Sequence, residues 1–184
     1  MTDLSLVERI VAIDDALDAN DVPHAFGGAL ALAYYTNEVR ATKDIDVNVF
    51  VPPAAVERVF GAFPNGVAWA SADIDRVQRD GQVRLWWGDT PVDLFFDLDD
   101  VHRQAAANAR VVPFARTEIP ILGSTELTVF KMRFSRSKDW VDIEAMLEAD
   151  SVDVAAVEVA YARIMGADDA GLVRLHQLAD AANA

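Results

Sequence analysis

The chain has 184 residues, of which 52% are hydrophobic and 25% charged, a composition typical of a folded domain with a well-buried core. It contains no cysteine, which excludes disulfides and thiolate metal sites, and its formal net charge of −14 argues against a general affinity for nucleic acid or anionic membranes. The first residues lack a secretory pattern and no apolar run reaches the roughly 20 residues that span a bilayer. We therefore expect a cytoplasmic protein with no membrane partner.

An amphipathic helix is predicted over residues 4–20, because apolar side chains recur there at helical spacing. A short strand is predicted over 24–26, and it ends at Gly27 and Gly28. Two glycines in a strand-to-helix turn allow a backbone to approach a phosphate closely, although an ordinary turn uses the same residues. Neither a Rossmann nor a P-loop glycine pattern accompanies this pair.

Two aspartates one residue apart, Asp44 and Asp46, lead into the next predicted strand. Side chains alternate along a strand, so both carboxylates should point to one side while Ile45 and Val47 point into the core. Two carboxylates held this close repel one another unless a positive charge lies between them. Oxygen ligands on a rigid strand suit Mg²⁺, which takes its other ligands from substrate phosphates and water. A solvated acidic strand edge is the alternative.

Residues 54–62 and 100–108 are predicted to form short helices, and 110–114 a strand. The segments 82–87 and 92–96 are apolar and β-rich, and the turn signal between them predicts a hairpin. In the second of these segments, side chains on one face include three acidic or aromatic residues: Asp93, Phe95 and Asp97.

The C-terminal third is predicted to be helical. Residues 124–149 have helical periodicity with Ser124 as the N-cap and a break near Ser135, and two further amphipathic helices follow. The simplest arrangement is an α/β (α+β) core over residues 1–122, with a mixed sheet flanked by helices, and a C-terminal helical cap over residues 123–184.

The glycine pair followed by Asp-x-Asp resembles the nucleotidyltransferase superfamily that includes DNA polymerase β. The lead-in with Arg40 and Thr42 is most similar to the AbiEii and MenT-like toxin branch. The resemblance covers most of residues 22–149. It implies a nucleotidyltransferase fold and Mg²⁺-dependent transfer of a nucleoside monophosphate from a nucleoside triphosphate (NTP) to an acceptor hydroxyl.

The resemblance also implies a two-ion metal site. Two Mg²⁺ ions usually take three carboxylates, and the superfamily places the third at the start of a strand ahead of aromatic residues. Asp93 matches this position and would join Asp44 and Asp46, with Asp97 as the substitute. The alternative for Asp93 is an ordinary aspartate at a hairpin edge. Gly27, Gly28, Arg40 and Thr42 would lie on the nucleotide side: the first two at the triphosphate, the others bracing the acidic turn or touching the triphosphate.

A second block, KMRFSRSKDWVD from Lys131 to Asp142, is similar to the basic and Lys-Asp-x-x-Asp elements of AbiEii-like transferases. Lys131 would present a compact cation to the β- and γ-phosphates, and Arg136 and Lys138 would add positive charge. Asp142 would orient Lys131 or Arg136, or act as general base towards the acceptor. A charged helical surface held by local ion pairs is the alternative.

Three functions follow from these features. By resemblance, the protein would be the toxin of a toxin–antitoxin pair, with a cognate antitoxin as partner and the tRNA 3′ end as acceptor. The acidic composition equally suits transfer to a small, cationic molecule such as an antibiotic. A non-catalytic, partner-binding member of the superfamily is the third interpretation, and the joint presence of Asp44, Asp46, Asp93 and Lys131 argues against it.

Overall fold

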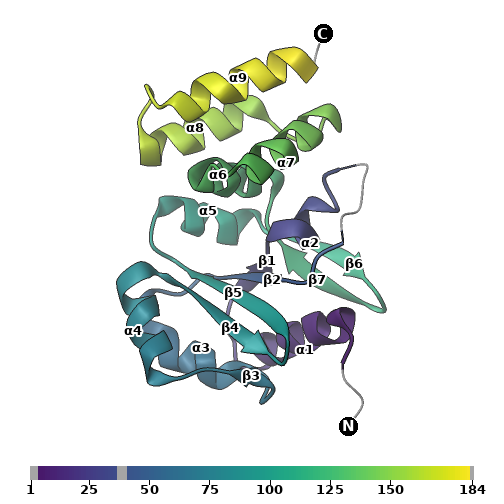
Figure 1. Ribbon diagram of the computed structural model, residues 1–184, viewed down its shortest axis with the longest axis vertical. Coiled ribbons are helices and arrows are strands. Elements are labelled where there is room, and N and C mark those ends of the chain that lie inside the picture. Colours follow the sequence, from purple (N-terminus) through teal and green to yellow (C-terminus); the bar gives the residue numbers. More distant parts are fainter. Residues whose placement is uncertain (1–3, 37–40, 183–184) are drawn as a thin grey trace.

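A mixed β-sheet forms the centre of the protein in the computed structural model, which describes residues 4–36 and 41–182 (Figure 1). Its strands, in chain order, are β1 (His24–Phe26), β2 (Ile45–Val49), β3 (Val67–Ala68), β4 (Gln82–Trp87), β5 (Thr90–Phe96), β6 (Arg110–Phe114) and β7 (Thr117–Ile121). Their order across the sheet is β3-β4-β5-β2-β1-β7-β6. The pairs β2–β5 and β1–β7 are parallel and the other neighbouring pairs are antiparallel, which confirms the predicted mixed sheet.

Helices surround this sheet. Those of the first part of the chain are α1 (Leu6–Ala19), α2 (Gly28–Leu32), the 3₁₀ turn η1 (Pro53–Ala55), α3 (Val56–Ala62), α4 (Ser71–Asp80) and α5 (Asp100–Asn108). The last third contains α6 (Ser124–Phe134), α7 (Ser137–Glu148), α8 (Val154–Met165) and α9 (Ala170–Ala182). None of the helices within the described ranges combines the length and apolarity that crossing a bilayer requires.

Side chains of the first turn cap the N-terminus of α1. The Ser5 hydroxyl accepts a hydrogen bond from the Glu8 backbone N–H, and the Glu8 carboxylate accepts one from the Ser5 backbone N–H. This reciprocal capping satisfies two of the donors that a helix start leaves open. Ile13 and Leu17 on the opposite side are fully buried, so the amphipathic pattern sets the face that packs on the core.

The sheet separates two layers of helices. In Figure 1, α1 and α3 lie below the sheet, and α5 to α9 are stacked above it. The helices α6 to α9 pack on one another, and α6 also contacts α2 and α5, which links this group to the sheet. We propose, as the sequence suggests, a boundary between residues 122 and 123, where the chain leaves the sheet for these helices.

Most of the predicted elements are present, and the differences have physical causes. Gly123, and not Ser124, occupies the N-cap of α6, without a side-chain hydrogen bond. The helix α4 was not predicted because it has few apolar residues, of which Val77 is buried. The strand β7, which contains Pro120, was not predicted.

Candidate active site

Asp46 and Asp93 lie side by side on β2 and β5, since the parallel pairing of these strands sets them opposite one another. Their neighbours Ile45, Val47 and Leu94 are buried on the opposite face of the sheet. Because side chains alternate along each strand, the two carboxylates share the face that is turned towards α6.

Asp44 immediately precedes β2 and is braced by the turn before it. The Thr42 hydroxyl accepts a hydrogen bond from the Asp44 backbone N–H and donates one to the Asp44 carbonyl, each 3.2 Å long. Thr42 therefore contacts the acidic turn itself. Arg40, assigned with it to the nucleotide side, lies outside the described residues.

The positive charge between the carboxylates comes from Arg84 on β4. Its Nε and Nη2 donate to the two Asp93 carboxylate oxygens at 2.7 Å and 2.6 Å, and Nη2 also lies 3.6 Å from Asp44 Oδ2. The sequence did not point to Arg84 as a residue of the site. The signal that could have identified it is the hairpin register, which pairs Arg84 with Asp93.

Several charged groups converge on Asp46. Burial, followed by the charges of Asp93 and Asp44, raises the pKa of Asp46 from 3.8 to about 6, and Lys131 and Lys138 act in the opposite direction. Each of these groups lies near enough to influence one carboxylate. The structure thus brings together five of the residues that the sequence singled out.

The turn at Gly27 and Gly28 packs closely against Asp46. The Gly27 backbone N–H donates to the Asp46 carbonyl oxygen at 2.9 Å. Gly28 has a φ of +53°, and a Cβ atom at this position would overlap the Asp46 carboxylate. Only glycine permits both the left-handed backbone and this close approach.

The cations of α6 and α7 are held by ion pairs. Lys131 Nζ donates to Asp142 Oδ2 at 2.8 Å, and each side chain is only 10% exposed. Arg136 pairs instead with Asp139, through Nε at 2.7 Å and Nη2 at 3.0 Å. Of the two partners that the sequence suggested for Asp142, Lys131 is therefore the one that it contacts.

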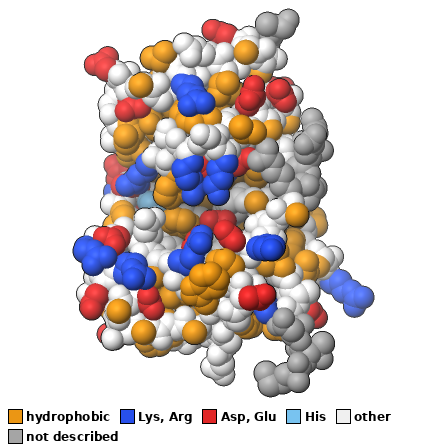
Figure 2. Space-filling model, in the orientation of Figure 1, with side chains coloured by type: hydrophobic (Ala, Val, Ile, Leu, Met, Phe, Trp, Pro, Cys, Tyr) orange, Lys and Arg blue, Asp and Glu red, His pale blue; other side chains and the backbone are white. Residues whose placement is uncertain are grey.

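A cavity of about 610 Å³ lies between the sheet and these helices. Figure 2 shows Lys and Arg side chains gathered across the middle of this face, on both sides of a recess with acidic side chains. The charged side chains that line the cavity are Asp46, Asp80, Asp93, Asp139, Arg76, Arg84, Lys131, Arg133 and Arg136. Phe95 and Phe134, whose rings meet edge to face at 5.8 Å, supply apolar surface.

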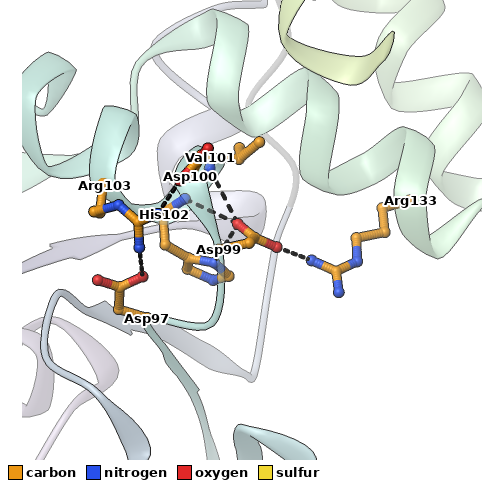
Figure 3. Close-up of polar contacts among 7 residues, drawn as sticks. All are labelled: Asp97, Asp99, Asp100, Val101, His102, Arg103 and Arg133. Carbon is orange, nitrogen blue, oxygen red and sulfur yellow. Dashed lines mark hydrogen bonds and ion pairs between the residues drawn. The ribbon is translucent and has the colours of Figure 1, made fainter. Parts of the chain in front are cut away.

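Asp99, which the sequence did not indicate, connects α5 and α6 beside this cavity (Figure 3). The Asp99 carboxylate caps α5 through the backbone N–H groups of Val101 and His102, lies 3.0 Å from His102 Nδ1, and accepts from Arg133 of α6 at 2.6 Å. Asp97, the substitute third carboxylate, lies beyond the end of β5 and forms an ion pair with Arg103 at 3.8 Å.

The donor set suits a hard divalent cation. Among the residues that the structure describes, no three Asp, Glu or His side chains converge as a preformed metal site. Two carboxylates are nevertheless adjacent, and the Arg84 guanidinium already contacts the oxygens of Asp93 and Asp44 as a stand-in cation. Carboxylate oxygens of this kind are what Mg²⁺ prefers, so the residues fit the ion once Arg84 moves.

The solution structure of the antibiotic-resistance factor ANT(2'')-Ia is similar to this chain, with a TM-score of 0.56 and 16% identity over 85% of this chain and 89% of that one. The chain has a nucleotidyltransferase fold. Two further solved structures match less well. The crystal structure of ANT(2'')-Ia in complex with adenylyl-2''-tobramycin has a TM-score of 0.47 and 17% identity, and the match covers 96% of each chain. An antigenic nucleotidyltransferase-like protein from Paracoccidioides brasiliensis has a TM-score of 0.49 and 14% identity, and the match covers 91% of each chain. No family model and no curated protein matches the sequence.

Proposed function

We propose that the protein is an Mg²⁺-dependent nucleotidyltransferase that transfers a nucleoside monophosphate from an NTP to an acceptor hydroxyl. The observation that carries this proposal is the register that sets Asp46 opposite Asp93 at the floor of a cavity lined by cations. Asp44, Asp46 and Asp93 would hold the metal. When bound, Mg²⁺ neutralises the charge that develops on the phosphate oxygens and orients the triphosphate.

The remaining charges suit a triphosphate. Lys131 is buried beside the carboxylates and fixed by Asp142, so it can present a cation to the β- and γ-phosphates without moving. Arg136 lines the same cavity and Lys138 acts on Asp46, so both add positive potential near the leaving pyrophosphate. Asp142 is in this view a positioning residue for Lys131 and not a general base.

The glycine turn would receive the nucleotide from the β1 side. Gly28 is half-buried and lines the cavity next to Asp46, where a side chain would overlap the carboxylate, and the buried Gly27 holds this turn on the Asp46 carbonyl oxygen. Thr42 would keep the acidic turn in place through its two hydrogen bonds, and Arg40 would assist it.

For the acceptor we propose RNA, with the tRNA 3′ end as the specific site, and a biological role as the toxin of a toxin–antitoxin pair with a cognate antitoxin. Five Lys and Arg side chains line the cavity together with four Asp side chains, so the cavity is locally far less acidic than the whole protein, whose net charge is −14. Affinity for a polyanion follows the local field and not the total charge, so these cations support an anionic acceptor once metal ions neutralise the carboxylates.

A small hydroxylated acceptor is the second candidate. The solved structure with the TM-score of 0.56 is described as an antibiotic-resistance factor. A cavity of about 610 Å³ also has the size of a small-molecule site. The strong negative charge of the chain would attract a cationic antibiotic.

The test is incubation with each labelled NTP and Mg²⁺, together with total tRNA, an aminoglycoside, or neither. Label on tRNA supports the first acceptor and label on the aminoglycoside the second. Asp46→Ala should abolish incorporation while the circular dichroism spectrum stays unchanged, and Asp75→Ala, which removes an exposed aspartate of α4, should not affect it. Unchanged turnover in Asp46→Ala would end the assignment of catalysis to this site, whereas no incorporation by the wild type with any NTP would favour a non-catalytic binding module.

A further inference from the structure

Arg84 completes a row of charged side chains across three neighbouring strands. The parallel register pairs Asp46 of β2 with Asp93 of β5, and the antiparallel hairpin register pairs Asp93 with Arg84 of β4. All three side chains therefore project from the same face of the sheet, towards the cavity that they line.

The Arg84 guanidinium binds the carboxylate oxygens that a metal ion would need as ligands. Both carboxylate oxygens of Asp93 accept hydrogen bonds from Arg84, at 2.7 Å and 2.6 Å, and one oxygen of Asp44 lies 3.6 Å from Nη2. A bidentate pair of this geometry is among the stronger ionic hydrogen bonds. A divalent cation shared by Asp44 and Asp93 would have to replace these contacts.

Arg84 differs from Lys131 in its freedom to move. Its side chain is 49% exposed, whereas that of Lys131 is 10% exposed and anchored by Asp142. An exposed arginine leaves an ion pair at little cost because water solvates it, but a buried lysine does not. Of these two cations, Arg84 is therefore the one that can leave its carboxylate.

We propose that Arg84 is an internal counter-ion of the metal site: it neutralises Asp93 and Asp44 while no divalent cation is bound, and it must release Asp93 when one binds. This rests on the proposed metal site. Once released, the side chain still lines the cavity, where its fork can pair with a phosphate of the nucleotide. Arg84 thus acts as a positioning residue that sets the affinity of the carboxylates for metal.

The first test measures Mn²⁺ binding to the full chain by electron paramagnetic resonance, without nucleotide. Arg84→Gln should bind Mn²⁺ about fivefold more tightly than the wild type, the gain expected from removing one competing ion pair at a partly exposed site. The matched control is Arg76→Gln: Arg76 lines the same cavity and is also 49% exposed, but pairs with Asp73 at 3.1 Å. Its affinity for Mn²⁺ should change less than twofold.

The second test follows the Arg84 Nε–H resonance by NMR during titration with Mg²⁺. We expect this resonance to shift as the hydrogen bond to Asp93 is lost, with the same midpoint as metal binding. Metal binding without any change in this resonance, or equal tightening in Arg84→Gln and Arg76→Gln, would overturn the role of Arg84 alone. If neither the wild type nor Arg84→Gln binds Mn²⁺, the proposed metal site itself is wrong, and this inference fails with it.

Discussion

Asp46 and Asp93 face one another across the parallel pair β2–β5, and their proximity is unfavourable unless a cation compensates it. Burial and then the charges of Asp93 and Asp44 raise the pKa of Asp46 to about 6. The carboxylates of the site therefore repel one another, and a bound cation would relieve this repulsion. This is the behaviour expected where function, and not stability, determines the arrangement.

The first prediction concerns stability against pH in the metal-free protein. A carboxyl group whose pKa is higher in the folded state than in the unfolded state contributes stability at low pH, and that contribution is lost as the pH rises through the folded pKa. For Asp46 the loss should occur between pH 3.8 and about 6. In EDTA at pH 7.5, Asp46→Asn should therefore be more stable than the wild type by roughly 3 kcal/mol, because each pKa unit between 3.8 and about 6 corresponds to about 1.4 kcal/mol.

Urea unfolding at several pH values checks this prediction. The advantage of Asp46→Asn should shrink below pH 6 and vanish below the ordinary aspartate value. If the unfolding free energies of the wild type and Asp46→Asn differed by the same amount at every pH, the pKa of Asp46 would not be raised in the folded state.

The second prediction concerns the glycine turn. Gly28→Ala places a methyl group on the Asp46 carboxylate and requires a positive φ, so it should displace Asp46, lower stability by about 1–3 kcal/mol and abolish nucleotide transfer. Gly61→Ala in α3 is the matched control, since a methyl group there would point into open space and alanine favours a helix. Thermal melting and transfer assays of both variants check this; normal activity in Gly28→Ala contradicts it.

The third prediction concerns the buried pair of Lys131 and Asp142. Asp142→Ala removes the partner that compensates the buried ammonium group, so unfolding free energy should fall by about 3 kcal/mol. Lys131→Met combined with Asp142→Leu removes both charges and should cost less than Asp142→Ala alone, although it should abolish transfer. Denaturant unfolding of the two variants measures this difference, and equal costs would show that the pair is not desolvated.

The fourth prediction concerns Asp99, which joins α5 to α6 (Figure 3). Burial acts against it, but His102 and Arg133 hold the pKa of Asp99 below its ordinary value, so its contribution to stability is present at neutral pH and is lost as the pH falls. Asp99→Ala should cost about 1–2 kcal/mol by removing both the cap and the ion pairs. Asp99→Asn keeps the cap oxygen and should cost less at pH 7, a comparison that unfolding curves of the two variants provide.

Local pattern was sufficient for much of the fold. The alternation of Ile45 and Val47 with Asp46 predicted a strand with one acidic face, and the helical spacing of apolar side chains over residues 4–20 predicted the first helix. The helix α4 and the strand β7 were missed because each offers only a few apolar residues along its length. Gly123, and not Ser124, is the N-cap because Ser124 is already the first residue of α6.

The sequence by itself determined which residue types stand at Gly28, Asp44 and Asp46, and that the two carboxylates emerge on one side of a strand, because these relationships depend on neighbours along the chain. Only the tertiary structure decided that Asp93 stands opposite Asp46 while Asp97 pairs with Arg103, and that Arg84 lies on the carboxylates. Register between strands separated by some forty-seven positions, as between Asp46 and Asp93, is set by packing of the sheet against its helices and not by any local preference.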